Sequence, residues 1–500
     1  MTKNLLPTTP TGRRFVGLLG GAAALAGSAA ALTFAASPAS GITTLVVDSN
    51  ADAAADATHC TNGTAGDCTL RDALAAAQDG DTITFDASIG STITMAPVNG
   101  QFVIDQAISI NGPGRDNLTI DGLNATRVFY IDGSVTGAVA ISGLTITNGN
   151  SGGSAGGGFK SAPLTVDVTI SDAAFTNNTT ISAGGGIAVY ANSATFSNVV
   201  VTGNTARHDA GMRVISNNIS ASHLQVFSNS ADVSNGGAYL SDSSGGQTLT
   251  VSDSTFSNNS SSTRSGGLNV RWSVGTASIT GSTFADNDGR GVMLRPEYGS
   301  TLTFANCTVT GNSSGDSGAG IFLYSSYSDV TIAQVTVTSN TSTSTDPAVA
   351  EGSGLGFYTY SGSAGSVTIT GSIIAGNIGA NVHDIGGTQL TSLPFTIDHS
   401  LIGTVSSNIA YTDSGGVTAN VTDPGLNALA NNGGATKTMS LKATSPAIDA
   451  GPNPVATFPG NQFDQRGPGF ARIAFGRSDI GAFEIQEPTP DQPVVPNFTG

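Results

Sequence analysis

The chain has 500 residues, of which 66 are glycine and only 11% are charged, and its formal net charge is −17. Because 38% of the residues are hydrophobic, this is not the composition of a disordered chain, and glycine without a strict triplet period excludes collagen. A strongly acidic surface repels nucleic acid and anionic lipid, so we expect neither as a partner.

The first 40 residues have the pattern of a signal peptide. Lys3, Arg13 and Arg14 precede an apolar run from Phe15 to Ala36, and small residues follow this run. We expect general secretion, and the two adjacent arginines leave twin-arginine export open. No later run reaches the ~20 apolar residues of a membrane span. The sequence therefore predicts a protein that is secreted or displayed at the cell surface, with no membrane span once the signal is removed.

The next segment, residues 41–100, is expected to cap one end of the fold. Cys60 and Cys68 lie close together in a chain expected in an oxidising compartment, which predicts a disulfide between them. Thr69 and Asp72 have the spacing of a capping box at the start of a short helix over residues 69–78. Cys307 is expected to be buried as a small hydrophobic residue, and none of the three cysteines predicts a metal site.

Residues 101–400 are expected to form a repeating fold. An apolar residue, two further residues and an asparagine recur about every 28 residues, which leaves room for three short strands and three turns. One coil per repeat predicts an all-β, right-handed parallel β-helix of about 11 coils. Stacked coils would align the asparagines in a ladder at one turn, which we favour over glycosylation as the reason for the many Asn-x-Ser/Thr triplets. The asparagines of the pattern are Asn178, Asn204, Asn229, Asn259, Asn287, Asn312, Asn340 and Asn377.

A glycine precedes an alternating strand in each repeat. Side chains of a strand point to opposite faces in turn, so this strand has one inward and one outward set. The glycines are Gly186, Gly211, Gly237, Gly267, Gly291, Gly320 and Gly356. Together with the asparagines, they predict that the coils stay in register.

The outward residues differ between the three predicted strand columns. Two columns present mainly threonine. The column that ends at the asparagines has Thr195, Thr255, Thr283, Thr308 and Thr310, and the other has Thr250, Ser278, Thr303, Thr331 and Thr368. The glycine-led column instead presents Tyr190, Arg213, Tyr239, Asn269, Arg271, Met293, Arg295, Phe322, Tyr324, Tyr358 and Tyr360.

This glycine-led column is the main candidate for a binding face. Aromatic rings cover the apolar faces of sugars, and guanidinium groups bind carboxylate or sulfate, so we expect extracellular polysaccharide or a host-cell surface as the partner. The candidate ligand-binding residues are Tyr190, Arg213, Tyr239, Arg271, Arg295, Phe322, Tyr324, Tyr358 and Tyr360. The alternative is that these large side chains only stack on a flat sheet and stabilise it.

A second hypothesis is a polysaccharide lyase or glycoside hydrolase that uses the same face. The candidates for acid, base or charge stabilisation are Asp209, Asp288, Asp316, Arg271 and Arg295, although we favour the simpler explanation that the acids are solvated turn residues. A third hypothesis is a structural protein of the cell envelope. No cofactor is expected. The glycine-rich nonapeptides that bind calcium tightly are absent, so nothing in the sequence argues for calcium, although it is left open. We expect a monomer.

Motifs at both ends of the repeat region resemble known exported proteins. The stretch from Cys68 to Ala73, followed by residues 80–83, resembles the CSLREA motif at the start of many exported β-helix proteins, with Thr69 and Asp72 as conservative departures. Residues 445–451, 464–467 and 479–484 look like the choice-of-anchor Q domain. This resemblance implies a C-terminal cap over residues 401–485, followed by a Pro-rich tail over residues 486–500.

The repeats themselves have two further resemblances. The Phe-x-x-Asn pattern and residues 236–240 are similar to the repeats of chlamydial polymorphic outer membrane proteins, which implies an adhesin-like role. The predicted solenoid resembles the pectin-lyase-like fold, several of whose known members degrade polysaccharides. Neither resemblance brings catalytic residues with it.

Overall fold

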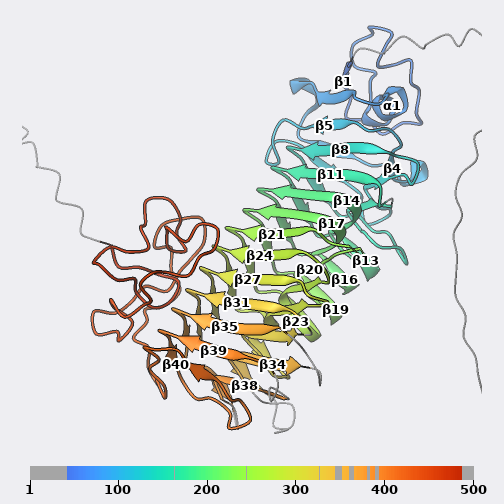
Figure 1. Cartoon of the computed structure of the whole chain (residues 1–500). Helices are drawn as coiled ribbons and strands as arrows, with labels where there is room; N and C mark the ends of the chain where they lie inside the picture. The colour runs from blue at the N-terminus through green and yellow to red at the C-terminus, as the bar shows by residue number, and fades with distance from the viewer. Residues whose placement is uncertain are drawn as a thin grey trace, which may run out of the picture. The chain divides into compact units, whose positions relative to one another are not determined.

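The computed structural model describes residues 42–486 except 163, 244, 326, 344–351, 360–364, 380–382 and 389–392. The predicted signal peptide, Tyr360 and residues 487–500 of the predicted tail lie outside the described residues. The described chain is a right-handed parallel β-helix in which each coil contributes strands to parallel ladders (Figure 1). The predicted fold of about 11 coils is confirmed. Within the described part of the chain, no helix is long and apolar enough to cross a bilayer.

One ladder is a separate twelve-stranded sheet with one short strand per coil. Its central residues, such as Phe256 and Phe284, point inward, and these two rings stack with their centroids 5.2 Å apart. The strands are β3 (Thr92–Thr94), β6 (Thr119–Asp121), β9 (Thr145–Thr147), β12 (Ala174–Thr176), β15 (Val200–Thr202), β18 (Gln225–Phe227), β22 (Thr255–Ser257), β25 (Thr283–Ala285), β28 (Thr308–Thr310), β32 (Thr336–Thr338), β36 (Ile373–Ile374) and β40 (Leu401–Ile402).

A second ladder, the glycine-led ladder, carries the predicted binding face. Its strands are β4 (Phe102–Ile104), β7 (Phe129–Ile131), β10 (Phe159–Ser161), β14 (Ile187–Ser197), β17 (Met212–Ser222), β20 (Ala238–Ser241), β23 (Ser260–Trp272), β26 (Asp288–Pro296), β30 (Ile321–Ser325), β34 (Leu355–Thr359) and β38 (Ile385–Thr388). Strands β14 and β17 are long enough to continue into the third ladder.

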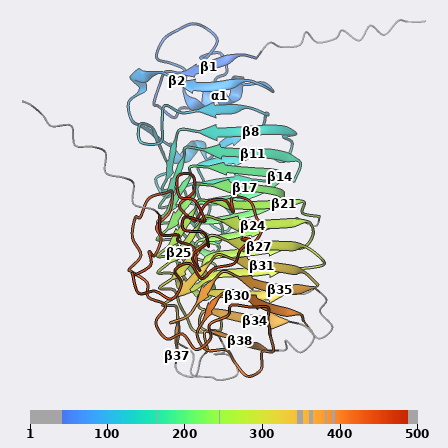
Figure 2. The same ribbon diagram turned by 60° about the vertical axis from the view of Figure 1, so that its left-hand side comes forward.

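The third ladder, the threonine ladder, completes each coil (Figure 2). It contains the second halves of β14 and β17 together with β1 (Thr44–Val47), β2 (Thr82–Phe85), β5 (Ser109–Asn111), β8 (Gly137–Ser142), β11 (Val166–Ser171), β21 (Thr248–Ser252), β24 (Thr276–Thr280), β27 (Thr301–Ala305), β31 (Asp329–Ala333), β35 (Ser366–Thr370), β39 (Phe395–Asp398) and β41 (Thr412–Asp413). Thr195 pairs with Ser220 and so belongs here, not to the asparagine-ended column in which it was predicted. The reason is that β14 runs without a break from one ladder into the next.

Short strands bridge the turn between the twelve-stranded sheet and the glycine-led ladder. They are β13 (Thr179–Ala183), β16 (Thr205–His208), β19 (Ser230–Ser234), β29 (Ser313–Ser314), β33 (Thr341–Ser342) and β37 (Ile378–Gly379). The first residues of β23 and β26 pass through the same turn.

The predicted asparagine ladder occupies this turn and is confirmed. Each Nδ2 donates to the Oδ1 of the asparagine one coil further on, at 2.8–3.0 Å, and the backbone N–H donates to the same oxygen. The ladder runs from Asn178 to Asn377, whose Nδ2 donates to Asp384 Oδ1 at 3.0 Å. All of its members up to Asn340 are fully or almost fully buried, so the ladder explains the sequon-like triplets.

The regular spacing of glycine and asparagine from repeat to repeat has a steric cause. A Cβ atom on Gly237 would lie 2.3 Å from the carbonyl oxygen of Gly267 and 3.1 Å from Asn259 Nδ2. The asparagine ladder therefore packs against the glycines, and any larger residue would push the coils apart. In the last repeat the aligned glycine is Gly354, because Leu355 pairs with Ile321. The prediction of Gly356 at this place was wrong by two residues.

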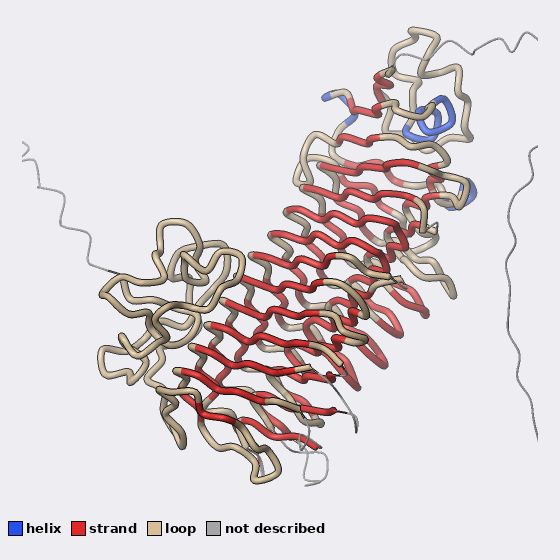
Figure 3. The backbone as a smooth tube through the Cα atoms, viewed as in Figure 1, coloured by secondary structure: helices blue, strands red, loops and turns tan. Residues whose placement is uncertain are grey.

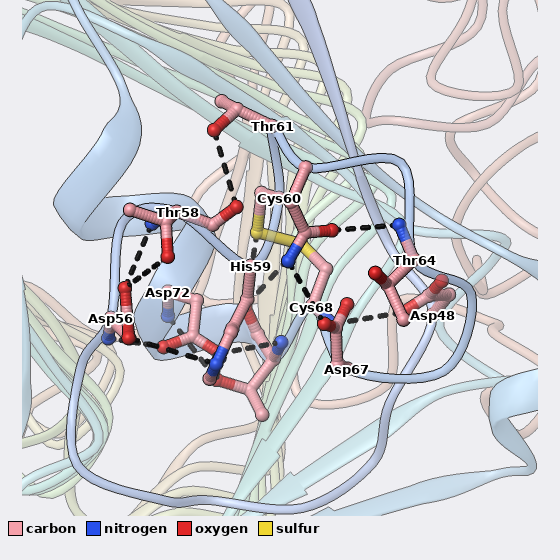
Figure 4. The surroundings of a disulfide bond; sticks show 12 residues. Asp48, Asp56, Thr58, His59, Cys60, Thr61, Thr64, Asp67, Cys68 and Asp72 are labelled. Atoms are coloured by element: carbon pink, nitrogen blue, oxygen red, sulfur yellow. Dashed lines mark hydrogen bonds and ion pairs between the residues drawn. A yellow bond between two sulfur atoms is a disulfide. The ribbon is translucent and has the colours of Figure 1, made fainter.

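The N-terminal cap contains helix α1 (Leu70–Ala76) and two short 3₁₀ turns, η1 (Ala87–Ile89) and η2 (Pro97–Asn99). Thr69 and Asp72 form both hydrogen bonds of the predicted capping box. The predicted Cys60–Cys68 disulfide is present beside the helix (Figure 4). Asp72 also accepts hydrogen bonds from the backbone N–H of Asp56 and lies 3.2 Å from His59 Nδ1, so one buried carboxylate joins the disulfide loop to the helix.

Residues 424–486, called the C-terminal segment below, have almost no regular strand (Figure 3). The segment lies against the outer face of the twelve-stranded sheet, where Arg472 Nη2 donates to Asn306 Oδ1 at 2.6 Å. Thr308 Oγ1 donates to Gln465 Oε1 at 2.6 Å, and Thr283 Oγ1 donates to the Lys437 carbonyl at 2.6 Å. Thr283, Thr308 and Thr310 are therefore buried, so the prediction that they form a bland outer face was wrong. Cys307 is buried, as predicted.

Candidate functional site

The outward side chains of the glycine-led ladder form two parallel rows. Strand pairing aligns the first row as Tyr130, Lys160, Ala188, Arg213, Tyr239, Asn269, Met293 and Phe322. It aligns the second row as Tyr190, Ile215, Ser241, Arg271 and Arg295, and then Tyr324 and Tyr358. We call these two rows the Tyr/Arg strip. Since neighbouring strands lie ~4.8 Å apart, each coil adds one pair of side chains to it.

Asp209 and Arg213 form the first ion pair of the strip. Arg213 Nη1 lies 2.6 Å from Asp209 Oδ2, and Asn235 Nδ2 donates to Asp209 Oδ1 at 2.7 Å. Burial raises the pKa of the Asp209 carboxyl, against the lowering effect of Arg213. The Arg213 guanidinium lies 5.3 Å from the centre of the Tyr239 ring, so carboxylate and ring together fix its plane.

A shallow groove of about 410 Å³ opens beside this ion pair. Its lining includes Asp209, Arg213, Tyr239, His208 and Arg264. His208 Nδ1 lies 2.9 Å from Ser234 Oγ, and Arg264 is exposed at a positive φ of 79°. A non-glycine residue in this conformation is strained, and here it holds a guanidinium at the rim of the groove.

Arg271, Arg295 and Glu297 form the second charged cluster. Arg271 donates to both carboxylate oxygens of Glu297 at 3.0–3.2 Å, and Arg295 Nη2 lies 3.7 Å from the same carboxylate. The hydrogen bonds to Glu297 raise the pKa of Arg271. Two guanidinium groups therefore share one carboxylate, which leaves one positive charge in excess.

Aromatic rings continue the strip beyond this cluster. The Arg295 guanidinium lies 5.0 Å from the Tyr324 ring centre, and the Tyr324 and Tyr358 rings stack 5.1 Å apart at an angle of 5°. Phe322 of the first row has its ring centre 4.4 Å from the Arg290 guanidinium, which lies at the turn before the strand. Burial lowers the pKa of Arg290, which also pairs with Asp316 at 3.1 Å.

The structure corrects two of the predicted outward residues. Asn269 is fully buried and Met293 is 7% exposed, although both point out of the barrel in register with Tyr239 and Phe322. A larger outward side chain lies one coil away from each, Tyr239 next to Asn269 and Phe322 next to Met293. Asn269 Nδ2 donates to Asn235 Oδ1 at 2.9 Å, so this residue supports the Asp209 cluster from beneath. The sequence alone cannot predict such burial, because it depends on which side chains lie one coil away.

Basic and aromatic residues of the earlier coils were missed. Lys160 and Arg127 lie 5.8 and 5.5 Å from the Tyr130 ring centre, and Lys160 is in register with the strip. The alternation in Phe129-Tyr130-Ile131 was the signal that could have found them, because Phe129 and Ile131 are buried on either side of Tyr130.

The candidate acids do not form a catalytic pair. Asp288 pairs through its backbone with Ser313, whereas the Asp316 side chain binds Arg290. In the described residues, no three His, Cys, Asp or Glu side chains come together as a metal site. Three buried polar atoms of the strip lack a partner in the described chain: Arg213 Nε, Asn269 Oδ1 and Arg295 Nε. These three atoms are buried, so the strip presents its positive charge through the exposed parts of the guanidinium groups.

The fold defines the chain as a right-handed parallel β-helix protein. Residues 261–397 match the family model described as "Right handed beta helix region". No curated protein matches the sequence.

Several solved structures are similar to the chain at low identity. The pectate lyase Pel9A is 14% identical over 89% of this chain and 97% of its own, with a TM-score of 0.39. The PL6 family alginate lyase AlyGC is 13% identical over 83% of this chain and 58% of its own, with a TM-score of 0.40. A mannuronic acid specific family 6 lyase from human gut microbiota is 10% identical over 69% of this chain and 86% of its own, with a TM-score of 0.26.

Proposed function

We propose that the chain is an exported, adhesin-like β-helix protein that binds acidic extracellular polysaccharide along the Tyr/Arg strip. The observation that carries this proposal is the concentration of positive charge on one ladder of an acidic protein. The chain has 18 lysines and arginines against 35 acidic residues. Seven of the basic residues lie on the strip or on the turns beside it, namely Arg127, Lys160, Arg213, Arg264, Arg271, Arg290 and Arg295.

Electrostatics favours an acidic ligand on this strip. A negative protein repels polyanions from most of its surface, so a local excess of guanidinium groups directs them to one place. Asp209, Glu297 and Asp316 are each already paired with arginine, whereas Asp232 and Asp288 are exposed on the turns beside the strip. Guanidinium groups bind carboxylate and sulfate with paired hydrogen bonds, which suits uronic acid or sulfated polymers.

The aromatic rings supply the second part of the site. Tyr239, Phe322, Tyr324 and Tyr358 are partly exposed, and their flat surfaces can cover the apolar faces of sugar rings. Stacking against arginine or a second tyrosine fixes these rings, which lowers the entropy that binding would cost. Residues arranged one pair per coil favour a linear polymer that runs along the ladder.

Export is part of the same proposal. It is supported by the signal-like pattern of residues 1–40 and by the Cys60–Cys68 disulfide, since disulfides persist in oxidising compartments. Detection of the protein in the culture medium or on intact cells, with a mature N-terminus near residue 41, tests this part.

Binding is tested with alginate, polygalacturonate and heparin as acidic probes, and with dextran as the neutral comparison. We expect the chain to bind at least one acidic polymer, with affinity that falls as salt is added because the charges are exposed to solvent. The double variant Arg271→Gln, Arg295→Gln should weaken binding at least about tenfold, the ratio that corresponds to ~1.4 kcal/mol.

The matched control is the double variant Lys437→Gln, Lys442→Gln, which removes two exposed basic residues of the C-terminal segment. It should leave binding unchanged. If the control and the strip variants weaken binding equally, the effect is one of net charge and the proposal fails. If no acidic polymer binds, the large side chains of the strip serve only the stability of the sheet, as a structural envelope protein would require.

A second candidate function is a polysaccharide lyase or hydrolase on the same strip. The observation that favours it is the groove where the buried Asp209 carboxyl lies beside His208 and Arg264. Perturbed acids in a groove are candidates for proton transfer. Incubation with polygalacturonate or alginate should then release unsaturated products or new reducing ends, and Asp209→Asn should abolish the release while binding persists. If the polymer binds but no product forms, the catalytic function is excluded and the binding function remains.

A further inference from the structure

A further concave site lies on the twelve-stranded sheet, not on the Tyr/Arg strip. It is a groove of about 470 Å³, within the range of ligand sites in proteins. Its floor is formed by outward side chains of β18 and β22, namely Gln225, Phe227, Thr255 and Ser257. Nothing described above assigns a role to it.

The C-terminal segment forms one wall of this groove. In Figure 2 the segment lies over the part of the solenoid that contains β25. Thr436 Oγ1 donates to the Gly281 carbonyl at 2.9 Å, and Thr283 Oγ1 donates to the Lys437 carbonyl. Gln465 Nε2 donates to Thr283 Oγ1 and to Thr436 Oγ1 at 2.9 and 3.0 Å. The wall is therefore fixed to the floor by buried hydrogen bonds, and the groove exists before any ligand arrives.

Polar groups of opposite kinds surround an aromatic ring in this groove. Phe227 is half-buried and is the one aromatic residue among the four floor residues, beside Gln225, Thr255 and Ser257. Asp253 and Asp286 lie at turns on the two sides of the sheet, and Lys437 lies on the wall. In the part of the chain that the structure describes, the side chains of Gln225 and Lys437 make no hydrogen bond and are exposed. The groove thus presents donors and acceptors around one apolar surface.

This chemistry selects a different ligand from that of the strip. Two carboxylates and one ammonium group line the groove, so an acidic polymer is repelled rather than attracted. A neutral sugar has hydroxyl groups that both donate and accept hydrogen bonds, and it has an apolar ring face that can cover Phe227. We propose that the groove is a second carbohydrate site, which binds a short neutral oligosaccharide between the solenoid and the C-terminal segment.

The proposal is tested with the full chain and four neutral trisaccharides: cellotriose, maltotriose, xylotriose and tri-N-acetylchitotriose. Saturation-transfer NMR should detect binding of at least one, and titration calorimetry gives its Kd. Phe227→Ala should weaken binding at least about tenfold. Thr255→Trp should abolish binding, because the indole fills the floor of the groove.

The strip variant Arg271→Gln, Arg295→Gln is the matched control and should keep trisaccharide binding. Phe227→Ala should in turn keep the binding of acidic polymers, so failure at one site is distinguishable from failure at the other. Phe227 and Thr255 point outward, so thermal unfolding of both variants should stay close to that of the parent. The proposal is overturned if no trisaccharide binds, if binding survives both groove variants, or if the strip variant abolishes it.

Discussion

The glycine-led ladder and the twelve-stranded sheet belong to the same coils but carry opposite kinds of outer surface. The first presents arginine and aromatic side chains that remain partly exposed, such as Arg271 and Tyr324. The second presents small residues, and from β25 to β36 these are covered by the C-terminal segment. One repeat therefore gives two faces, of which one is free and the other is an internal interface.

The difference shows that outward threonines, which look exposed from the sequence, can be buried by a second layer of chain. Thr283, Thr308 and Thr336 each form a hydrogen bond with the C-terminal segment. A short side chain lets another backbone approach closely, and its hydroxyl satisfies the polar groups that become buried. A uniform threonine face is thus well suited to receive a second layer, whereas long charged side chains keep a face open.

The asparagine ladder joins these two faces, and breaking it should have the largest effect. Asn287→Ala removes the acceptor of two donors of Asn259 and removes one donor to the carbonyl of Phe256. Since each buried unpaired group costs ~1–3 kcal/mol, we expect a loss of about 4 kcal/mol in the free energy of unfolding. Chemical denaturation measures it. Asn192→Ala, at an exposed position of β14 with an ordinary backbone conformation, is the control, and similar losses in both variants would show that the ladder is unimportant.

Removing the arginine that fixes the C-terminal segment should have the next largest effect, confined to the covered face. Arg472 is buried and donates to Asn306 Oδ1 and to the Gly481 carbonyl. We expect Arg472→Met to destabilise the docked segment by about 3 kcal/mol, because buried partners lose their charge-assisted bonds. Hydrogen exchange should rise in residues 424–486 but not in β20 or β30. Faster exchange across all coils would contradict a local role.

The docked segment should also respond to pH. Burial, with the nearby Asp479 carboxyl, raises the pKa of Glu484 to about 8, from an ordinary value of 4.5; burial raises the pKa of Asp479 as well. The folded state favours the protonated Glu484 carboxyl. The contribution of this carboxyl to the stability of the docked segment is therefore complete below pH 4.5 and is lost as the pH rises to about 8. Tryptic cleavage after Lys437 and Lys442 should therefore be faster at about pH 9 than at about pH 6, relative to a standard peptide. Glu484→Gln should lose most of this difference, and an equal difference in the variant would exclude Glu484 as its source.

The smallest effect on stability is expected on the open face. Tyr324→Ala removes one stacked pair with Tyr358, which is worth less than ~1 kcal/mol in a sheet. We expect the unfolding temperature to change little while binding of the acidic polymer weakens severalfold. A large loss of stability without a loss of binding would assign the ring to the support of the sheet.

Local rules made most of the fold predictable. The asparagines and glycines lie at fixed positions because one ladder packs against the other, and that steric relation leaves a repeat in the sequence. The capping box and the disulfide depend on residues close in sequence, namely Thr69 with Asp72 and Cys60 with Cys68. Period-two alternation also gave the direction of the strip residues.

Contacts between distant residues were not predictable. Thr283 and Gln465 are 182 residues apart, and no periodic pattern in the C-terminal segment marks the face on which it docks. The burial of Asn269 follows from neighbours in other coils, and the position of Gly354 follows from strand pairing across a longer repeat. The groove beside Phe227 is formed by strands of the solenoid together with the distant C-terminal segment, so no local pattern marks it.

The asparagine ladder has a direction as well as a stabilising role. Every Nδ2 points toward the C-terminal end of the stack, so the amide dipoles add along the solenoid in the way that peptide dipoles add along a helix. The Asp384 carboxylate accepts the last donor and puts a negative charge at the positive end of this array. A carboxylate has no proton to pass on to a further coil. Asp384 therefore acts as a terminator, and duplication of repeats could lengthen this ladder only on its N-terminal side.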